Sequence, residues 1–272
     1  MGMTSEGEHS VTDRSSVSEH CLVSSLDGSR EPVLFAPANT AAPAPLIVAL
    51  HTWSFNRTNQ VEPVLPFALA RGWHVLFPEF RGPNLASNPR APQACASELA
   101  LGDVLDAVAW AKTQIQVQPG ALFLLGGSGG GHMALMLAAH RPKLWDLVYA
   151  SCPITDLILW HGQNAHYRAH IEACCSGPPD TPERRAVYQA RSPFFQPGMA
   201  DAAVHIAHGR QDASVPFTHS IALYNRLLQT RPDARAWLDI FDGGHELHYE
   251  TAFARFDHTL AAPARPNDTL SQ

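Results

Sequence analysis

A serine flanked by glycines is the part of the sequence that most directly indicates chemistry. Residues 126–130 read Gly-Gly-Ser-Gly-Gly, with an apolar segment before them at residues 122–125 and a helix-forming segment after them at residues 133–139. A G-x-S-x-G motif between a strand and a helix holds its serine on a sharp turn, where a base can take the hydroxyl proton. We therefore predict that Ser128 is a nucleophile. The alternative is a plain glycine-rich turn.

A nucleophilic serine needs a base, and the base needs an acid that orients it. Where the serine stands on such a turn, the acid and then the histidine follow along the chain. Asp212 follows a predicted strand at residues 204–207, and His245 follows the last predicted strand, at residues 236–241. Both fall at the carboxyl ends of strands, where ligand sites of open α/β sheets lie. We predict Asp212 as the acid and His245 as the base.

Two other aspartates compete for the role of the acid. Asp156 follows the strand after Ser128 and is the main alternative. Asp242 lies only three residues before His245 on the same turn, so its carboxylate would struggle to reach the ring. A simpler alternative makes Asp212 a turn or helix-capping aspartate and His245 a loop histidine beside two glycines.

Acyl transfer also requires two hydrogen-bond donors for the oxyanion that forms in the tetrahedral intermediate. The first predicted donor is the backbone N–H of Gly129, the residue after the nucleophile. The second is expected in residues 51–54, which read His-Thr-Trp-Ser after a predicted strand. This loop resembles the His-Gly-x loops of many hydrolases, with Thr52 in place of the glycine, and that register assigns the donor to Trp53. We also expect the Trp53 indole to contact substrate in the acyl pocket. The alternative is that this indole only packs in the core.

The segments that position these residues alternate between strand and helix from about residue 20 onward. This alternation indicates an α/β fold with a mostly parallel sheet that is covered on both faces. The eight predicted strands lie at residues 21–26, 32–36, 46–50, 73–77, 122–125, 147–150, 204–207 and 236–241. The first two are expected to form an antiparallel hairpin around Asp27 and Gly28.

Helical periodicity marks the segments between these strands. The predicted helices lie at residues 60–71, 97–113, 133–140, 218–228 and 246–261. Pro63 and Pro66 argue for an irregular start to the first of them.

Residues 153–200 interrupt the alternation, because they are rich in proline, glycine, histidine and aromatic residues. Long irregular segments in compact domains are commonly lids, so we predict a cap over the active-site face. Trp160 is its predicted substrate contact. We expect a catalytic domain at residues 18–262 that includes this cap, and flexible tails at residues 1–17 and 263–272.

Length and charge exclude several classes of protein. A chain of 272 residues suits one large α/β domain. The 25 acidic residues outnumber the 19 basic ones, and the basic residues form no stripe, which argues against nucleic acid as a partner. The longest apolar runs have the length of strands, so no membrane span is expected. Because the N-terminus lacks the pattern of a signal peptide, we expect a cytoplasmic protein, and a homodimer is compatible with the sequence.

A metal site is the alternative kind of chemistry, and residue spacing argues against it. His245 and His248 are three residues apart, whereas the zinc motif H-E-x-x-H places its histidines four apart. Among His161, His166 and His170, only the last two have the spacing of one helical face. The five cysteines are scattered and show no metal spacing. We therefore predict no metal ligands and no cofactor.

These motifs together resemble the α/β-hydrolase superfamily over nearly all of residues 20–262, and the chain is most similar to the hydrolase domain of the prolyl oligopeptidase family. The resembling stretches are residues 72–82 (GWHVLFPEFRG), 103–110 (DVLDAVAW), 126–132 (GGSGGGH) and 209–216 (GRQDASVP). The resemblance implies an α/β-hydrolase fold, with a mostly parallel eight-stranded sheet, helices on both faces and a small cap insertion. It also implies a serine hydrolase that works through an acyl-enzyme.

The resemblance leaves the substrate open. Peptidases of the family carry a large N-terminal β-propeller, whereas few residues precede the predicted sheet here, so the chain resembles carboxylesterases and acyl esterases as much as peptidases. An ester also has a better leaving group than an amide. We therefore expect hydrolysis of small carboxylic esters ahead of peptidase or aminoacyl-hydrolase activity on a short peptide. A non-catalytic binding protein on the same fold is a further alternative, and an intact triad argues against it.

Overall fold

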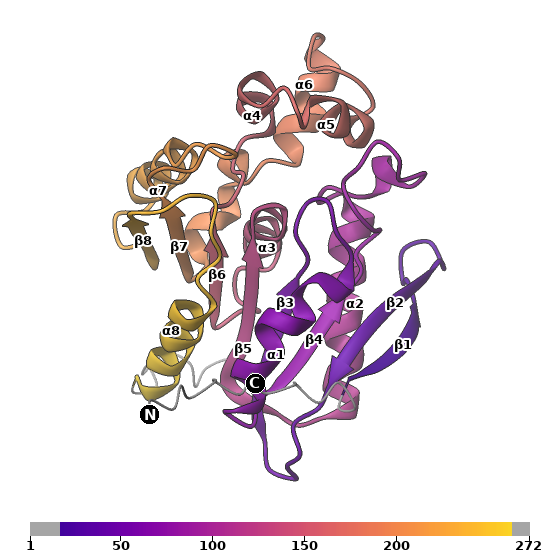
Figure 1. Ribbon diagram of the computed structural model, residues 1–272, viewed down its shortest axis with the longest axis vertical. Coiled ribbons are helices and arrows are strands. Elements are labelled where there is room, and N and C mark those ends of the chain that lie inside the picture. The colour runs from indigo at the N-terminus through magenta and orange to yellow at the C-terminus, as the bar shows by residue number, and fades with distance from the viewer. Residues whose placement is uncertain (1–16, 263–272) are drawn as a thin grey trace, which may run out of the picture.

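The computed structural model describes residues 17–262, in which eight strands form one sheet (Figure 1). Their order across the sheet is β1-β2-β4-β3-β5-β6-β7-β8. The strands are β1 (Ser18–Val23), β2 (Arg30–Ala36), β3 (Ala44–Leu50), β4 (His74–Pro78), β5 (Val117–Gly127), β6 (Leu147–Ser151), β7 (Val204–Gly209) and β8 (Ala236–Phe241). The prediction of an eight-stranded α/β sheet is therefore confirmed.

Antiparallel pairing is confined to the beginning of the chain. β2 runs antiparallel to β1 and to β4, whereas the neighbouring pairs from β4 to β8 are parallel. The predicted hairpin is present, but its first strand ends at Val23 instead of residue 26. The reason is a wide turn, in which the N–H of Ser24 donates to the carbonyl of Ser29 at 2.8 Å and Gly28 has a φ of 74°.

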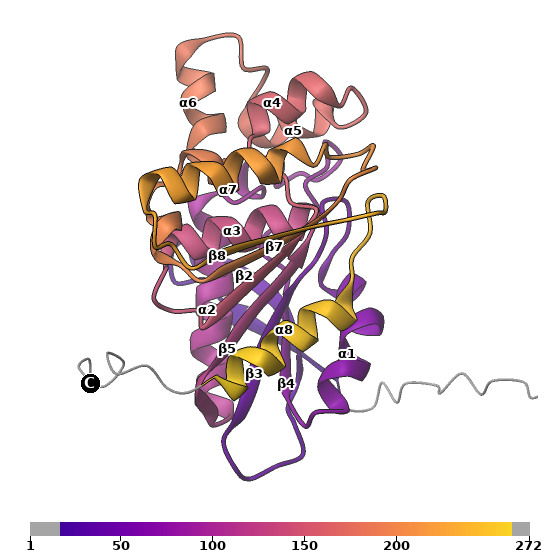
Figure 2. The same cartoon turned by 90° about the vertical axis from the view of Figure 1, so that its left-hand side faces the viewer.

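Helices cover both faces of the sheet, as predicted. Figure 2 shows α1 and α8 on one side and α2, α3 and α7 on the other. These helices are α1 (Val61–Leu69), α2 (Glu98–Gln114), α3 (Gly129–His140), α7 (Thr218–Thr230) and α8 (Tyr249–Ala261). Each side has its own buried apolar cluster: α1 and α8 pack on residues of β3 to β6, and α2, α3 and α7 pack on the opposite side chains of the same sheet. Alternation of side chains along each strand supplies both clusters.

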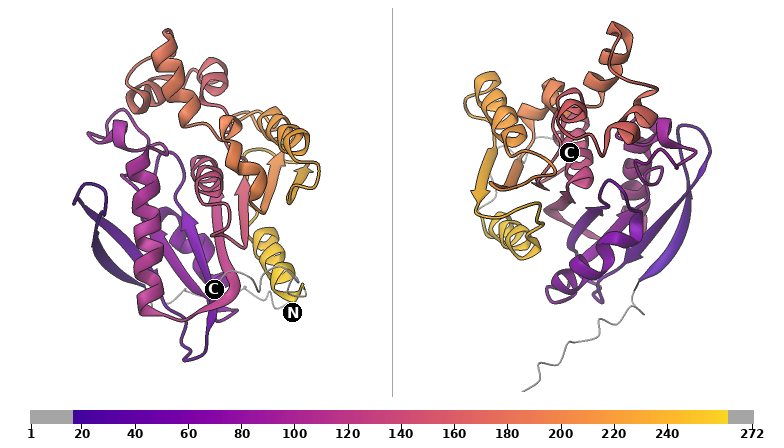
Figure 3. Two further views of the ribbon diagram at one scale, coloured as in Figure 1. Left: turned by 180° about the vertical axis from the view of Figure 1, so that it is seen from behind. Right: turned by 45° about the horizontal axis from the view of Figure 1, so that its top comes forward.

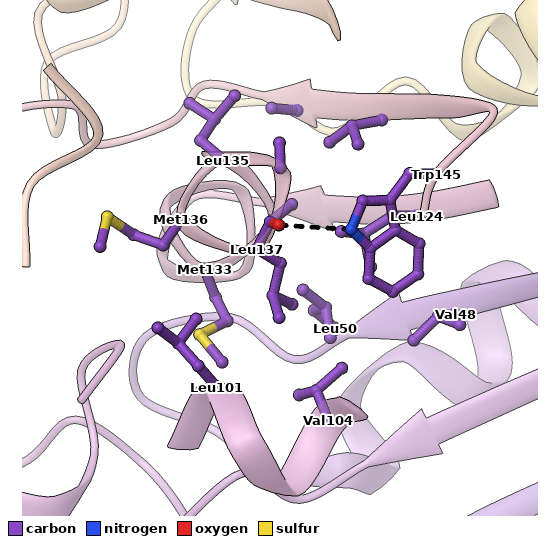
Figure 4. Packing of buried hydrophobic residues seen from close by; sticks show 14 of the residues in the cluster. Val48, Leu50, Leu101, Val104, Leu124, Met133, Leu135, Met136, Leu137 and Trp145 are labelled. Atoms are coloured by element: carbon purple, nitrogen blue, oxygen red, sulfur yellow. Dashed lines mark hydrogen bonds between the residues drawn. The ribbon is translucent and has the colours of Figure 1, made fainter. Parts of the chain in front are cut away.

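The helix that follows Ser128, α3, packs against the sheet with almost all of its residues buried. The residues of α3 from Gly129 to Ala138 are all buried. Figure 4 shows Leu137 of α3 packed toward Leu50 of β3, and Met133 toward Leu101 of α2. The Trp145 indole N–H donates to the carbonyl of Leu137 at 3.3 Å. Dense packing of this kind resists movement. The serine at the start of α3 is therefore held by a rigid support.

Residues 153–200 separate β6 from β7 and form a helical layer beyond the carboxyl ends of the parallel strands (Figure 3). The layer contains α4 (Leu157–Gln163), α5 (Arg168–Cys175) and α6 (Pro182–Ala190), followed by the 3-10 turns η4 (Pro193–Phe195) and η5 (Pro197–Asp201). The buried apolar side chains of α4, α5 and α6 share one cluster with Trp53, which follows β3, and Val215, which follows β7, whereas Met199 of η5 belongs to the cluster of α3. The segment predicted as a cap thus packs on the loops that follow the strands.

Each predicted helix differs from the structure by one to four residues at one or both ends; α3, for example, begins at Gly129 and not at residue 133. The 3-10 turn η2 (Arg57–Gln60) precedes α1, as the prolines suggested, and α1 ends at Leu69 before Gly72, whose φ is 66°. The last helix begins at Tyr249 and not at residue 246, because the carbonyl of Glu246 accepts a hydrogen bond from Ser151 in a turn.

The predicted tails, residues 1–17 and 263–272, lie outside the described residues except for Val17, which packs against the cluster of α1 and α8. No helix within residues 17–262 is both long and apolar enough to cross a bilayer.

Candidate active site

Ser128 joins β5 to α3 in a strained backbone conformation. Its φ is 55° and its ψ is −120°, values that few residues other than glycine adopt. Its N–H donates to the carbonyl of Ser151 at 2.8 Å, and its own carbonyl accepts from the N–H of His132 at 2.9 Å. The residue is partly exposed, between buried neighbours. This strained strand–turn–helix junction is the geometry of a nucleophile elbow.

The glycines after Ser128 allow the loop that follows β3 to lie directly on the elbow. A Cβ atom on Gly129 would lie 2.5 Å from the Cα of Trp53 and 2.6 Å from its backbone nitrogen. A Cβ atom on Gly130 would lie 2.6 Å from the carbonyl oxygen of Leu50. The structure therefore brings Gly129 and Trp53 together, the two residues predicted to supply the oxyanion donors.

Asp212 follows β7, and its side chain is completely buried. Its Oδ1 accepts from the N–H groups of Ser214 at 2.8 Å and Val215 at 2.9 Å. Its Oδ2 lies 2.6 Å from Nδ1 of His245. Two backbone donors thus fix the carboxylate, which leaves the other oxygen to orient the imidazole ring.

A second histidine, His208 at the end of β7, also contacts Asp212, and sequence reasoning did not identify it. Its Nε2 lies 3.2 Å from Asp212 Oδ2 and 2.9 Å from the carbonyl of Val215, while its Nδ1 lies 2.7 Å from the hydroxyl of Ser220. Both partners of Nε2 are acceptors, so Nε2 carries the proton and Nδ1 accepts from Ser220. The signal available in the sequence was its place four residues before Asp212.

Burial and hydrogen bonding act in opposite directions on the pKa of Asp212. Burial raises this pKa, but hydrogen bonds from His208, His245 and the N–H of Val215 outweigh the effect of burial and hold it well below its usual range. Asp212 is therefore ionised near neutral pH, which is the state that stabilises an imidazolium on its partner.

His245 stands on the turn after β8, where neighbouring segments hold the backbone. The hydroxyl of Ser151 donates to the carbonyl of Glu246 at 3.0 Å, and the N–H of Gln211 donates to the carbonyl of Gly243 at 2.8 Å. The side chain of His245 is 28% exposed. The ring is thus fixed by Asp212 on one side and accessible to a substrate on the other.

The two competing aspartates have other partners. Asp156 is the N-cap of α4, where its carboxylate accepts from the N–H groups of Ile158 and Leu159. Asp242 is exposed and lies 3.7 Å from Arg210. Asp212 is therefore the only one of the three candidate aspartates whose contacts include His245.

The loop that carries Trp53 is held in place by its neighbours. The ring of His51 stacks on Phe80 with centroids 3.8 Å apart, and its Nε2 lies 2.8 Å from the carbonyl of Glu79. Burial lowers the pKa of His51, so the ring is neutral. The carbonyl of Trp53 accepts from the N–H of Asn84 at 2.8 Å. These contacts fix the backbone on which the second predicted oxyanion donor lies.

The two tryptophans predicted to contact substrate are buried against each other. Trp53 is 2% exposed and Trp160 is 1% exposed, and their ring centroids lie 4.9 Å apart. The indole N–H of Trp160 donates to the carbonyl of Ser214 at 2.9 Å, whereas the indole N–H of Trp53 is buried and has no hydrogen-bond partner among residues 17–262. Trp160 thus supports Trp53 and the turn beside Asp212, and its direct contact with substrate stays a prediction.

The histidines weighed as metal ligands are engaged separately. Nε2 of His161 lies 2.8 Å from Glu172, and Nδ1 of His170 accepts from the N–H of Ala86 at 3.0 Å. His248 lies 3.2 Å from Glu246 on the turn after β8. These contacts do not bring the histidines to a common point among the described residues.

Comparisons with known proteins identify the family of this chain. The sequence model of the prolyl oligopeptidase family matches residues 67–261. An uncharacterized peptidase, YtmA of Bacillus subtilis (strain 168), is 27% identical over 122 residues, which are 44% of this chain and 46% of that protein.

Solved structures share the fold at low sequence identity. A putative dipeptidyl aminopeptidase IV from Bacteroides ovatus ATCC 8483 matches with a TM-score of 0.72 and 18% identity over 89% of this chain and 36% of its own. An acylaminoacyl peptidase from Pyrococcus horikoshii matches with a TM-score of 0.67 and 17% identity over 86% of this chain and 38% of its own. The chain thus spans less than half the length of these relatives. From the matched residues and the fold, the chain belongs to the prolyl oligopeptidase family of serine hydrolases.

Proposed function

We propose that the chain hydrolyses short peptide or aminoacyl bonds through an acyl-enzyme on Ser128, with His245 as the base and Asp212 as the acid that orients it. The observation that carries the proposal is the 2.6 Å contact between His245 Nδ1 and Asp212 Oδ2. Ser151 links the turn of His245 to the elbow, because its hydroxyl donates to the carbonyl of Glu246 and its carbonyl accepts from the N–H of Ser128. We propose residues 18–262 as the catalytic domain and residues 153–200 as its cap.

The proposed first step transfers the Ser128 hydroxyl proton to Nε2 of His245 while Oγ attacks the scissile carbonyl. The negative charge that develops on the carbonyl oxygen is bound by the N–H groups of Gly129 and Trp53. His245 then protonates the leaving amine, which departs and leaves the acyl group on Ser128. In the second half, His245 takes a proton from water, and the resulting attack releases the acid and restores the serine.

The family match and the peptidases named among the relatives support a peptide or aminoacyl substrate ahead of a simple ester. This order reverses the preference expected from the sequence, which rested on leaving-group chemistry. Carboxylic esters remain the second candidate, because an activated serine that attacks an amide also attacks the more reactive ester. A cytoplasmic location and a homodimer stay predictions from the sequence.

The size of the acyl group follows from the burial of Trp53. Its backbone and Cβ lie against Gly129, and its indole packs on Trp160 in an apolar cluster that also contains Leu157 and Val215. A side chain in that position restricts the acyl group that can lie beside the nucleophile. We propose that small acyl or aminoacyl groups are preferred over bulky ones.

A panel of aminoacyl 4-nitroanilides and p-nitrophenyl esters of increasing acyl length tests the proposal, together with titration by a fluorophosphonate probe. We expect stoichiometric labelling of Ser128 and turnover of small aminoacyl anilides. Turnover of esters alone would favour the second candidate. No labelling of the folded protein would contradict both and support a non-catalytic binding protein.

A further inference from the structure

Cys152 lies beside the triad but has no part in the proposed mechanism. It follows β6, is fully buried, and has a φ of 45°, which is in the left-handed region. Its N–H donates to the carbonyl of Ala207 in β7 at 2.8 Å. Its thiol lies 3.4 Å from the carbonyl of Glu246, on the turn that carries His245. The sulfur is therefore held between β7 and the histidine turn.

The sulfur belongs to a compact set of potential metal ligands. Sγ of Cys152, a carboxylate oxygen of Asp212 and a ring nitrogen of His245 all lie within 4.8 Å of one another. Thiolate, imidazole and carboxylate are the donors that bind Zn²⁺ in proteins, with Zn–S distances of about 2.3 Å and Zn–N or Zn–O distances of about 2.0–2.2 Å. Three donors in such a small volume need only small shifts to surround one ion.

We propose that Cys152, Asp212 and His245 form an inhibitory binding site for Zn²⁺. The thiolate and the imidazole favour Zn²⁺ over Mg²⁺ and Ca²⁺, which prefer oxygen ligands. Three protein ligands leave a fourth position for water, as in other open zinc sites. The ion is a regulator in this proposal and not a cofactor of the reaction. Its inhibitory effect rests on the proposed function, whereas its binding does not.

Proton positions explain why a bound ion would stop catalysis. The Cys152 thiol loses its proton to solvent and binds as thiolate. Nδ1 of His245 uses its lone pair to bind the ion, so the proton of the neutral ring moves to Nε2. An Nε2 that carries a proton cannot accept the one on Ser128. Asp212, which binds the same ion, no longer orients the imidazole, so acylation stops although the serine is untouched.

Binding is tested with Co²⁺ as the probe, because a thiolate ligand gives Co²⁺ a charge-transfer band in the near ultraviolet. The full chain is titrated in parallel with Cys152→Ala and with Cys21→Ala, which removes an exposed cysteine on β1. We expect the band in the unaltered chain and in Cys21→Ala, and its loss in Cys152→Ala. Calorimetry with Zn²⁺ should show an affinity lower by at least about tenfold in Cys152→Ala.

Inhibition is tested by the rate at which the fluorophosphonate probe labels Ser128. For each variant, the rate with ZnCl₂ is divided by the rate without it. We expect Zn²⁺ to slow labelling of the unaltered chain, a chelator to restore it, and MgCl₂ to have no effect. The ratio should return to one in Cys152→Ala and in Cys152→Ser, with thermal melts to confirm that both fold.

Equal Zn²⁺ sensitivity in the unaltered chain and both Cys152 variants would overturn the site, as would a Co²⁺ band that survives Cys152→Ala. If the unaltered chain does not react with the probe, the proposed function fails on its own. The Co²⁺ band then still decides whether the binding site exists.

Discussion

Nε2 of His208 lies 3.2 Å from Oδ2 of Asp212, the same oxygen that lies 2.6 Å from Nδ1 of His245. One carboxylate oxygen thus has two imidazole neighbours, one fully buried and one that is partly exposed. The buried ring occupies the side of the oxygen that faces the protein interior. It therefore limits rotation of the carboxylate and favours the position in which the exposed ring is oriented.

We expect His208→Ala to lower kcat by about tenfold with little change in KM, because a hydrogen bond to a charged group contributes about 1.5–3 kcal/mol. His208→Gln retains an amide donor and should lose less. Steady-state kinetics on both variants and on the unaltered chain measure the difference. A lower melting temperature with unchanged kcat would show that His208 has only a structural role.

Substitutions in the triad test the assigned roles. We expect Ser128→Ala and His245→Ala to lower kcat by several orders of magnitude, about 10⁴-fold or more, with the fold retained. Asp212→Asn should be comparably severe, since it removes the acceptor for the Nδ1 proton. Asp156→Asn is the matched control, because Asp156 caps α4. The assignment of the acid is wrong if the control loses turnover and Asp212→Asn keeps it.

Gly129→Ala tests the contact between the elbow and the loop after β3. The added methyl would lie 2.5 Å from the Cα of Trp53, so the two backbones must separate. We expect a loss of about 100-fold or more in kcat, since a displacement of about 1 Å misplaces the oxyanion donors. Gly162→Ala is the control, because its added methyl meets no atom within 4 Å. Similar activity in both variants would show that the contact has no part in catalysis.

Trp53→Ala tests whether the indole restricts the acyl group. The backbone N–H remains, so part of the catalysis should persist while preference moves toward longer acyl chains. The ratio of kcat/KM for a long and a short p-nitrophenyl ester measures the change. An unchanged ratio would mean that the ring only fills the core.

Trp160→Ala tests whether this side chain only stabilises the fold or also contributes to substrate specificity. Because Trp160 is 1% exposed, its truncation should destabilise the fold by about 3–5 kcal/mol. If Trp160 also contacts substrate, KM should rise more for bulky esters than for acetate esters. Equal losses on both, with a lower melting temperature, assign the residue to stability.

The buried side chain of His132 should make the stability of the fold depend on pH. Burial lowers its pKa to about 4 from the ordinary value of 6.5. Between these values the unfolded chain binds a proton that the folded chain does not, so stability is full above about pH 6.5 and falls as the pH approaches 4. This difference in pKa between the folded and unfolded chain corresponds to about 3 kcal/mol in the free energy of unfolding.

Melting temperatures between pH 4 and 7 should therefore fall less steeply in His132→Gln than in the unaltered chain. His166→Gln is the control, because this histidine is exposed. Parallel curves for all three proteins would contradict the assignment.

The sequence predicted those features that depend on local pattern. The elbow is recognisable because its glycines are adjacent to Ser128, and the strands because their apolar runs are continuous. His208 was missed because a histidine inside a buried strand does not reveal which side chain it meets. The proximity of Cys152 to Asp212 and His245 was missed because only the packing of β6 against β7 brings these residues together. The burial of Trp160 was missed because its indole N–H donates to the carbonyl of Ser214, and no sequence pattern predicts that hydrogen bond.

The carbonyl of Ser214 accepts from two side chains of the cap segment, the indole of Trp160 and the amide of Asn164, each at 2.9 Å. The N–H of the same residue donates to Asp212. One peptide segment therefore joins the cap to the acid of the triad. A rigid outward swing of α4 must first break both bonds to this carbonyl or pull on the turn that fixes Asp212. If the proposed cap moves to admit a substrate, we therefore expect the position of Asp212 to change with it.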